Sequence, residues 1–212
     1  MTARNIARVL AGAVLAMTST LLSAFTDTHS ASAGSCPDVE VVFARGTHEP
    51  AGVGSVGQAF IDSLRPQVGE RSGTVYAVNY PATDDYVSSS SAGAADARGH
   101  IEYMAANCPN TRMVLGGYSQ GASVIDTATN DLDPVVDHVA AVAVFGNPES
   151  TFARRMWGGR LATTSPLYQT KTIDLCVPED PICSEGKNLA AHAQYVQSGM
   201  PIQAAAFVAA RL

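Results

Sequence analysis

Five short apolar segments alternate along the chain with segments of helical character, and this alternation constrains the fold more than any other feature. Strands that are apolar on both faces are typical of a parallel sheet covered by helices on both sides. Parallel strands are joined by right-handed crossovers, which place helices on both faces of the sheet. The predicted strands span residues 39–46, 74–82, 113–119, 138–148 and 170–176, and the predicted helices span residues 56–64, 91–108, 121–132 and 200–212.

The remaining segments predict no second domain. The chain of 212 residues is 46% hydrophobic and 15% charged, which is enough to bury a substantial core. The serine run at residues 88–91 is interpreted as a loop that leads into a helix. Because the connections between strands are short or taken up by crossover helices, no inserted segment is long enough to form a lid. We therefore expect one three-layer α/β domain around a five-stranded parallel sheet.

The first 33 residues have a different character. Arg4 and Arg8 precede a short apolar run at residues 9–17, and a small-residue motif ends at Ala33. This is the layout of a secretory signal peptide, with cleavage after Ala33. Threonines and serines interrupt the apolar run well short of the ~20 residues that a membrane-spanning helix needs. We expect a secreted protein with no transmembrane anchor after cleavage and a single domain over residues 34–212; association with the cell wall is left open.

The charge of the mature chain excludes one class of partner. Of the 13 basic and 19 acidic residues, two arginines and one aspartate precede the cleavage site, so 11 basic and 18 acidic residues remain. No basic patch or run of lysine and arginine occurs, and nucleic acid is therefore not an expected partner. The acidity favours solubility.

Four cysteines, an even number in an exported chain, predict disulfides. They are Cys36, Cys108, Cys176 and Cys183, and no C-x-x-C spacing of the kind that zinc sites use is present. Of the three possible pairings we favour Cys36–Cys108 with Cys176–Cys183. The first would close a long loop and contribute up to ~4 kcal/mol, and the second a short loop contributing ~2.5 kcal/mol.

The third predicted strand runs straight into a helix through the sequence G-Y-S-Q-G. Glycine at positions 117 and 121 removes the Cβ atoms that would collide in so sharp a turn. The hydroxyl of Ser119 would then project at the start of the helix, where backbone N–H groups and the positive helix end favour an oxyanion. The G-x-S-x-G string alone also fits a plain glycine-rich turn. Its strand–turn–helix context favours a nucleophile.

A serine hydroxyl needs a base to take its proton before it can attack an ester. His100 lies inside a predicted helix and His138 starts a strand at the end away from the reactive loops, so both are interpreted as surface or packing residues. His48 precedes the serine, whereas the order along the chain in this fold is serine, acid, histidine. His192, after the last strand, is the predicted base.

The acid that orients the base is expected between the last strand and His192. The loop C-V-P-E-D-P-I-C there contains Glu179 and Asp180. Acidic residues beside prolines are also common in solvated turns, but a Cys176–Cys183 bridge would pin this loop in place. The residues by themselves leave the choice between Glu179 and Asp180 open.

Four motifs together, A-R-G-T, G-G-Y-S-Q-G-A-S, C-x-x-x-D-x-x-C and H-A-Q-Y, resemble the cutinase family of serine esterases, especially the cutinase-like proteins exported by mycobacteria. The resemblance covers residues 36–212, and the four cysteines match in order and spacing. It implies an α/β-hydrolase-like fold without a lid. It also implies that Ser119 is the nucleophile, His192 the base and Asp180, four residues after the first cysteine of the short loop, the acid.

The same resemblance implies an oxyanion hole made of two backbone N–H groups. One belongs to Gln120, directly after the nucleophile. The other belongs to Thr47, at a position where fungal members often carry serine. Loss of one such donor usually costs ~10²–10³ in rate.

We expect a monomeric secreted esterase that hydrolyses ester or lipid substrates through an acyl-enzyme intermediate, with no metal and no organic cofactor. Short- to medium-chain acyl esters, including cutin-like polyesters or lipids, are the expected substrates. An acetylxylan-type carbohydrate esterase or an acyltransferase of the same fold is the alternative within enzymes. A secreted binding protein that has lost activity is the alternative of another class.

Overall fold

One parallel sheet organises the part of the chain that the structure, a computed structural model, describes, residues 36–212. The predicted signal peptide, residues 1–33, and its cleavage site lie outside the described residues. The strand order is β2-β1-β3-β4-β5 and every neighbouring pair is parallel, which confirms the predicted fold class. The strands are β1 Val39–Ala44, β2 Gly73–Ala77, β3 Arg112–Tyr118, β4 Val139–Phe145 and β5 Thr172–Leu175.

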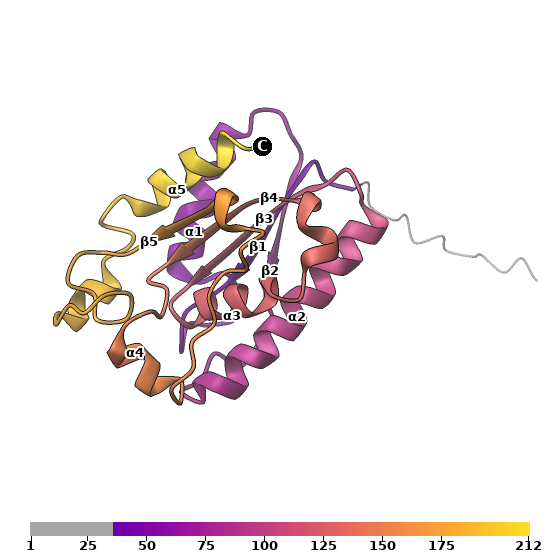
Figure 1. Ribbon diagram of the computed structural model, residues 1–212. Helices are drawn as coiled ribbons and strands as arrows, with labels where there is room; N and C mark the ends of the chain where they lie inside the picture. Colours follow the sequence, from indigo (N-terminus) through magenta and orange to yellow (C-terminus); the bar gives the residue numbers. More distant parts are fainter. Residues whose placement is uncertain (1–35) are drawn as a thin grey trace, which may run out of the picture. The chain divides into compact units, whose positions relative to one another are not determined.

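Helices cover both faces of the sheet (Figure 1). Successive side chains point to opposite faces: Val42 and Phe43 of β1 are both fully buried, but in separate apolar clusters. The Val42 cluster includes α2 and α3, whereas the Phe43 cluster includes α1 and α5. The helices are α1 Gly54–Leu64, α2 Tyr86–Asn107, α3 Gln120–Thr129, α4 Thr151–Met156 and α5 Met200–Ala209, with 3₁₀ turns η1 Arg65–Gln67, η2 Asp133–His138, η3 Gln169–Lys171 and η4 Leu189–Ala193.

The interpretation of the serine run at residues 88–91 as a loop is wrong, because these residues belong to the first turns of α2. Asp85 caps the helix, its side chain accepting a hydrogen bond from the Ser88 amide at 3.3 Å. Ser89 and Ser90 are buried. Their small side chains let α2 pack closely on α3, so tertiary packing overrides the modest helix propensity of serine.

Both favoured disulfides are present. Cys36–Cys108 joins the chain entering β1 to the residue that follows α2, with 5.5 Å between Cα atoms. Cys176–Cys183 closes the loop after β5, with 5.8 Å between Cα atoms. None of the helices described is long and apolar enough to cross a membrane.

Candidate active site

Ser119 occupies the sharp turn between β3 and α3. Its backbone has φ 55° and ψ −120°, a conformation that residues other than glycine rarely adopt and that is concentrated at functional sites. A Cβ atom on Gly117 would collide with the backbone of Gly121, and one on Gly121 would collide with the carbonyl of Ala44. The two glycines are therefore required by sterics, and they allow a strand to turn into a helix at a single serine.

The structure brings Ser119, His192 and Asp180 together in one chain of hydrogen bonds. The Nε2 atom of His192 lies 2.9 Å from the Oγ of Ser119, and its Nδ1 lies 2.7 Å from the Oδ2 of Asp180. Because an ionised carboxylate can only accept, the ring carries its proton on Nδ1, which leaves Nε2 free to accept the serine proton. Ser119 is 8% exposed and Asp180 fully buried. Ser119 follows β3, Asp180 lies in the loop after β5, and His192 lies on η4.

Asp180 remains ionised although no solvent reaches it. Burial by itself raises the pKa of this carboxyl group, but hydrogen bonds outweigh that effect and hold the pKa below its ordinary value. The donors are the ring of His192, the Tyr195 hydroxyl at 2.6 Å from Oδ2 and the Ile182 amide at 2.9 Å from Oδ1. Its neighbour Glu179 is exposed and adopts φ 68°. The geometry thus presents Asp180, and not Glu179, to the histidine.

The ring of His192 is held by aromatic neighbours. Tyr118 donates to the backbone carbonyl of His192 at 2.5 Å, and the two rings stack with their centroids 5.1 Å apart. Gly146, directly after β4, leaves room for this arrangement. A Cβ atom there would lie 3.0 Å from His192 Cε1 and 2.9 Å from the Tyr195 hydroxyl. Any side chain at residue 146 would therefore push against His192 and against Tyr195 together.

The short disulfide packs against Asp180. The Sγ atom of Cys183 lies 3.3 Å from Asp180 Oδ2 and 3.2 Å from the Tyr195 hydroxyl. Within the same loop the Asp180 amide donates to the carbonyl of Val177, and the Ser184 amide donates to the carbonyl of Asp180. The bridge and these backbone hydrogen bonds together fix the position of the Asp180 carboxylate relative to the His192 ring.

Gln120 begins α3, so its amide N–H has no partner within the helix. Its side chain is fully buried. The Nε2 atom donates to the carbonyl of Thr83 at 2.9 Å, and Oε1 accepts from the Ser89 hydroxyl at 3.4 Å. The helix that follows the serine is thereby joined to the loop before α2.

Thr47 lies in the turn after β1, and its neighbours fix that turn. The Gly46 amide donates to the Glu49 carboxylate at 2.7 Å, and the His48 amide donates to the carbonyl of Ala82 at 2.8 Å. The residues just before Thr47 pack against the backbone of Gly121, at the start of α3. The two amides predicted to form the oxyanion hole are therefore carried by segments in contact.

The other histidines of the described part lie apart from this hydrogen-bond chain. His48 is exposed and lies 3.2 Å from Asp84, and His138 ends η2. His100 lies 2.9 Å from the Glu40 carboxylate. This pair is on the face of the sheet that α2 covers, opposite the face that α1 covers. Within residues 36–212, no three histidine, cysteine or acidic side chains gather closely enough to hold a metal ion.

Sequence reasoning missed the residues that support the predicted three. Tyr118 and Gly146 carried no role, and the side chain of Gln120 was not considered. Tyr195 belongs to the H-A-Q-Y motif, but a motif shows no contact. The available signal was its position three residues after His192. Residues so close together, in a 3₁₀ turn and just after it, share the same surroundings.

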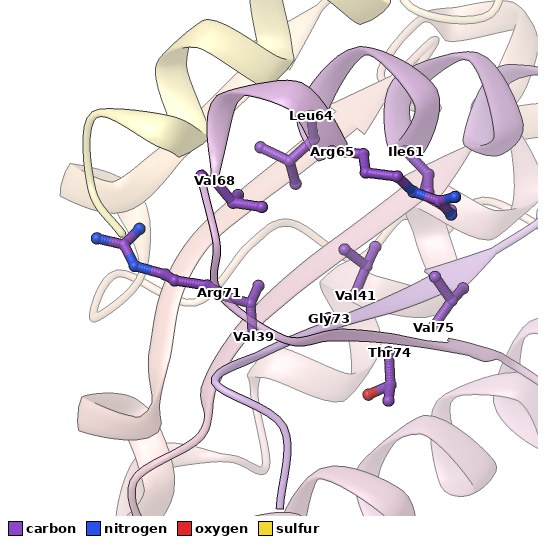
Figure 2. A pocket seen from close by; sticks show the side chains of 11 residues that line it. Val39, Val41, Ile61, Leu64, Arg65, Val68, Arg71, Gly73, Thr74 and Val75 are labelled. Atoms are coloured by element: carbon purple, nitrogen blue, oxygen red, sulfur yellow. The ribbon is translucent and has the colours of Figure 1, made fainter.

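A separate hollow of about 390 Å³ lies between α1 and the edge strand β2 (Figure 2). It is near the amino ends of β1 and β2, whereas Ser119 follows the carboxyl end of β3. Figure 2 shows valine, leucine and isoleucine side chains along it, with Arg71 pointing away from them and Arg65 extending beside Ile61. Its lining includes neither a serine nor a histidine, so it has no nucleophile–base pair.

A family model described as Cutinase matches residues 35–212. The chain belongs to the cutinase family. The resemblance on which the sequence interpretation relied is thus confirmed over the whole described part.

Three proteins illustrate what this cutinase-family chain is similar to in sequence and structure. It is 58% identical to Carboxylesterase Culp1 of Mycobacterium tuberculosis, with 100% of this chain and 98% of the relative covered. It is 48% identical to Phospholipase Culp4 of the same organism, with 99% and 93% covered. The solved structure of Trichoderma reesei cutinase in complex with a phosphonate inhibitor matches with 36% identity and a TM-score of 0.67, over 82% of this chain and 76% of that one.

Proposed function

We propose that this cutinase-family serine ester hydrolase uses Ser119 as its nucleophile, His192 as its base and Asp180 as the acid that orients the base. The observation that carries the proposal is the continuous hydrogen-bond chain from the Ser119 hydroxyl through both nitrogens of His192 to a buried, ionised Asp180. A nucleophile and base within hydrogen-bond reach, with the base held by a third group, is the arrangement that acyl transfer needs.

In the first half-reaction the Ser119 Oγ bonds to the ester carbonyl carbon while its proton passes to His192 Nε2. The Asp180 carboxylate stabilises the imidazolium that forms. The carbonyl oxygen becomes an oxyanion, and the amides of Gln120 and Thr47 donate to it. The C–O bond to the alcohol then breaks, and the imidazolium gives its proton to the leaving oxygen. Ser119 is left acylated.

The second half-reaction repeats these steps with water. His192 takes a proton from the water as its oxygen bonds to the acyl carbon, and the same two amides receive the second oxyanion. The ester bond to Ser119 breaks and the proton returns to the serine oxygen. A carboxylic acid leaves, and Ser119, His192 and Asp180 return to their starting protonation states. Every proton in the cycle moves through one nitrogen of one histidine.

A fluorophosphonate probe tests the nucleophile directly. It should label the wild type at Ser119 alone, and Ser119→Ala should lose both the label and ester hydrolysis. Ser123→Ala is the matched control, because Ser123 is also buried and lies one turn further along α3. Label found on another serine in the wild type, or hydrolysis retained in Ser119→Ala, would overturn the assignment.

The substrate class we propose is carboxylic esters of short- to medium-length acyl chains. The relatives named carboxylesterase and phospholipase point to two candidate classes, with the higher identity to the carboxylesterase. Initial rates on p-nitrophenyl esters from acetate to palmitate, beside phosphatidylcholine vesicles, separate them. A higher kcat/KM on the vesicles than on every soluble ester would replace our proposal with a phospholipase.

We also propose that the chain is exported, cleaved after Ala33 and monomeric. The two disulfides support an oxidising compartment. Amino-terminal sequencing of protein from culture medium should begin at Gly34, and light scattering should give the mass of one chain. Full-length protein retained inside the cell with its cysteines reduced would contradict export.

A further inference from the structure

We propose that Tyr195 is a positioning residue for ester hydrolysis: its hydroxyl fixes the Asp180 carboxylate and limits how tightly that carboxylate binds His192. The proposal rests on the roles given above to His192 and Asp180. The Tyr195 hydroxyl donates at 2.6 Å to Asp180 Oδ2, the same oxygen that lies 2.7 Å from His192 Nδ1. One carboxylate oxygen therefore serves two donors at once.

Tyr195 has a single available position. It is fully buried, and its ring packs edge-on against Phe145 and His192, with centroids 6.4 Å and 6.0 Å away. The hydroxyl also accepts a hydrogen bond from the Val177 amide at 3.2 Å. A phenol that is held on both sides of its oxygen cannot rotate away without leaving a buried polar group unpaired.

The shared oxygen determines the strength of the bond to His192. A buried carboxylate must be satisfied by donors because water does not reach it. Two donors on Oδ2 divide its negative charge, and the Ile182 amide holds Oδ1. Without the phenol, the whole charge of Oδ2 would face the imidazole ring. The imidazolium formed during the reaction would then be bound more tightly, and a carboxylate with one donor fewer would be less fixed.

Among residues 36–212, few titratable groups face His192 and Asp180. Tyr118 stacks on the ring from β3, Tyr195 approaches from the segment after η4, and the charge of Glu49 acts on Tyr118. Burial raises the pKa of Tyr118 and of Tyr195, so neither phenol ionises near neutral pH. The acid limb of the kcat/KM profile therefore reports on the His192–Asp180 pair.

Tyr195→Phe tests the proposal, with Tyr168→Phe as the matched control. Tyr168 is also fully buried and its hydroxyl donates to the carbonyl of Leu132 at 2.7 Å, but it lies in the cluster on the other face of the sheet. Both variants should lose stability. In Tyr195→Phe alone, the acid limb should move up by about one pH unit, and kcat should fall roughly 10-fold with KM within twofold.

A merely structural tyrosine gives a different result. If Tyr195→Phe has the wild-type pH profile and a loss of melting temperature like that of Tyr168→Phe, the proposal is overturned. Fluorophosphonate labelling separates this failure from that of the proposed function, because a wild type that is not labelled at Ser119 rejects the catalytic assignment itself. A wild type that is labelled but shows no shift of the limb in Tyr195→Phe rejects the positioning role.

A second measurement does not depend on the stability of that variant. Protein made with 3-fluorotyrosine keeps every hydroxyl but makes each a stronger donor. The acid limb should then move to lower pH, opposite to the shift in Tyr195→Phe. The same labelling in a Tyr118→Phe background should leave the shift in place, since Tyr118 donates to the backbone of His192 and not to Asp180. An unmoved limb in both fluorinated proteins would contradict the proposal.

Discussion

Among residues 36–212, two buried histidine–carboxylate pairs have nearly the same separation. His192 lies 2.7 Å from Asp180, and His100 lies 2.9 Å from Glu40. Both carboxylates are buried, with side chains 0% and 8% exposed, and both rings are mostly covered. A search for buried histidine–acid pairs would return both of them.

The pairs differ in what surrounds the rest of the ring. His100 uses Nε2 for its carboxylate and lies flat on Tyr76, with ring centroids 3.5 Å apart. His192 uses Nδ1 for its carboxylate and directs Nε2 at the hydroxyl of Ser119. Glu40 is near the amino end of β1, whereas Ser119 follows a carboxyl strand end. On the proposed mechanism, a histidine–carboxylate pair takes part in the chemistry only where the carboxyl end of a strand places a serine beside it.

The largest expected effect separates the two histidines. His192→Ala should lower kcat/KM by more than about 10⁴-fold, and adding Ser119→Ala should lower it little further, because the two act as a unit. His100→Ala should leave kcat/KM within about threefold of the wild type while lowering the melting temperature. Ester hydrolysis rates and thermal melts of all variants measure this. An equal loss of rate in both histidine variants would remove the distinction drawn here.

Replacing the two carboxylates, Asp180 and Glu40, should change kcat by amounts that differ almost as much. Asp180→Asn keeps the size of the side chain but favours the wrong imidazole tautomer, so we expect a loss of about 10⁴-fold in kcat. Glu40→Gln should change kcat by less than about threefold, since no reacting group contacts it. Glu179→Gln, beside Asp180 in the same loop but exposed, should also change it little. A larger effect from Glu179 than from Asp180 would show that the acid is misplaced.

An intermediate effect on the rate is expected from removing the Cys176–Cys183 bridge, which contacts the His192–Asp180 pair and not the His100–Glu40 pair. Cys176→Ala/Cys183→Ala should lower the rate about 10²-fold by displacing Asp180 about an ångström, although the bridge contributes ~2.5 kcal/mol to stability. The protein should still be folded at moderate temperature, as circular dichroism would show. Full activity with a lowered melting temperature would mean that the bridge is purely structural.

The smallest effect should come from Tyr76→Leu, which removes the ring under His100 and the hydroxyl bond to Asp96. We expect a loss of about 1–2 kcal/mol in unfolding free energy and an unchanged pH–rate profile. Urea denaturation and the rate profile together measure this. A shifted profile would mean that the two histidine pairs are coupled across the sheet.

Sequence predicted the sheet and the turn that carries Ser119 because those features depend on local rules. Runs of valine and alanine identify buried strands, and glycines around Ser119 identify a steric requirement that the structure shows at Gly117 and Gly121. The chain order of serine, acid and histidine then selected His192. The strand and glycine signals are each contained within a few residues, whereas the choice of Asp180 over Glu179 came from the resemblance to the cutinase family.

What the sequence could not show depends on packing between distant segments. The serines at 88–91 became helical because α2 packs on α3, and α4 is too short to carry a periodic pattern. The donor role of Tyr195 depends on η4 bringing it to a loop 15 residues earlier in the chain. Such contacts are set by the whole fold, and the sequence spacing of Tyr195 from His192 does not show which group its hydroxyl contacts.

The buried carboxamide of Gln120 has a consequence for changing what the enzyme accepts. It joins the helix that follows Ser119 to Thr83, in the loop before α2, and to Ser89, in the first turn of α2. A laboratory selection for bulkier substrates should gain little from loosening that loop alone, because these hydrogen bonds tie the loop to the helix that follows Ser119. Larger esters should instead be accepted through changes at residues outside these contacts, and replacements at position 120 should be destabilising because they leave buried polar groups unpaired.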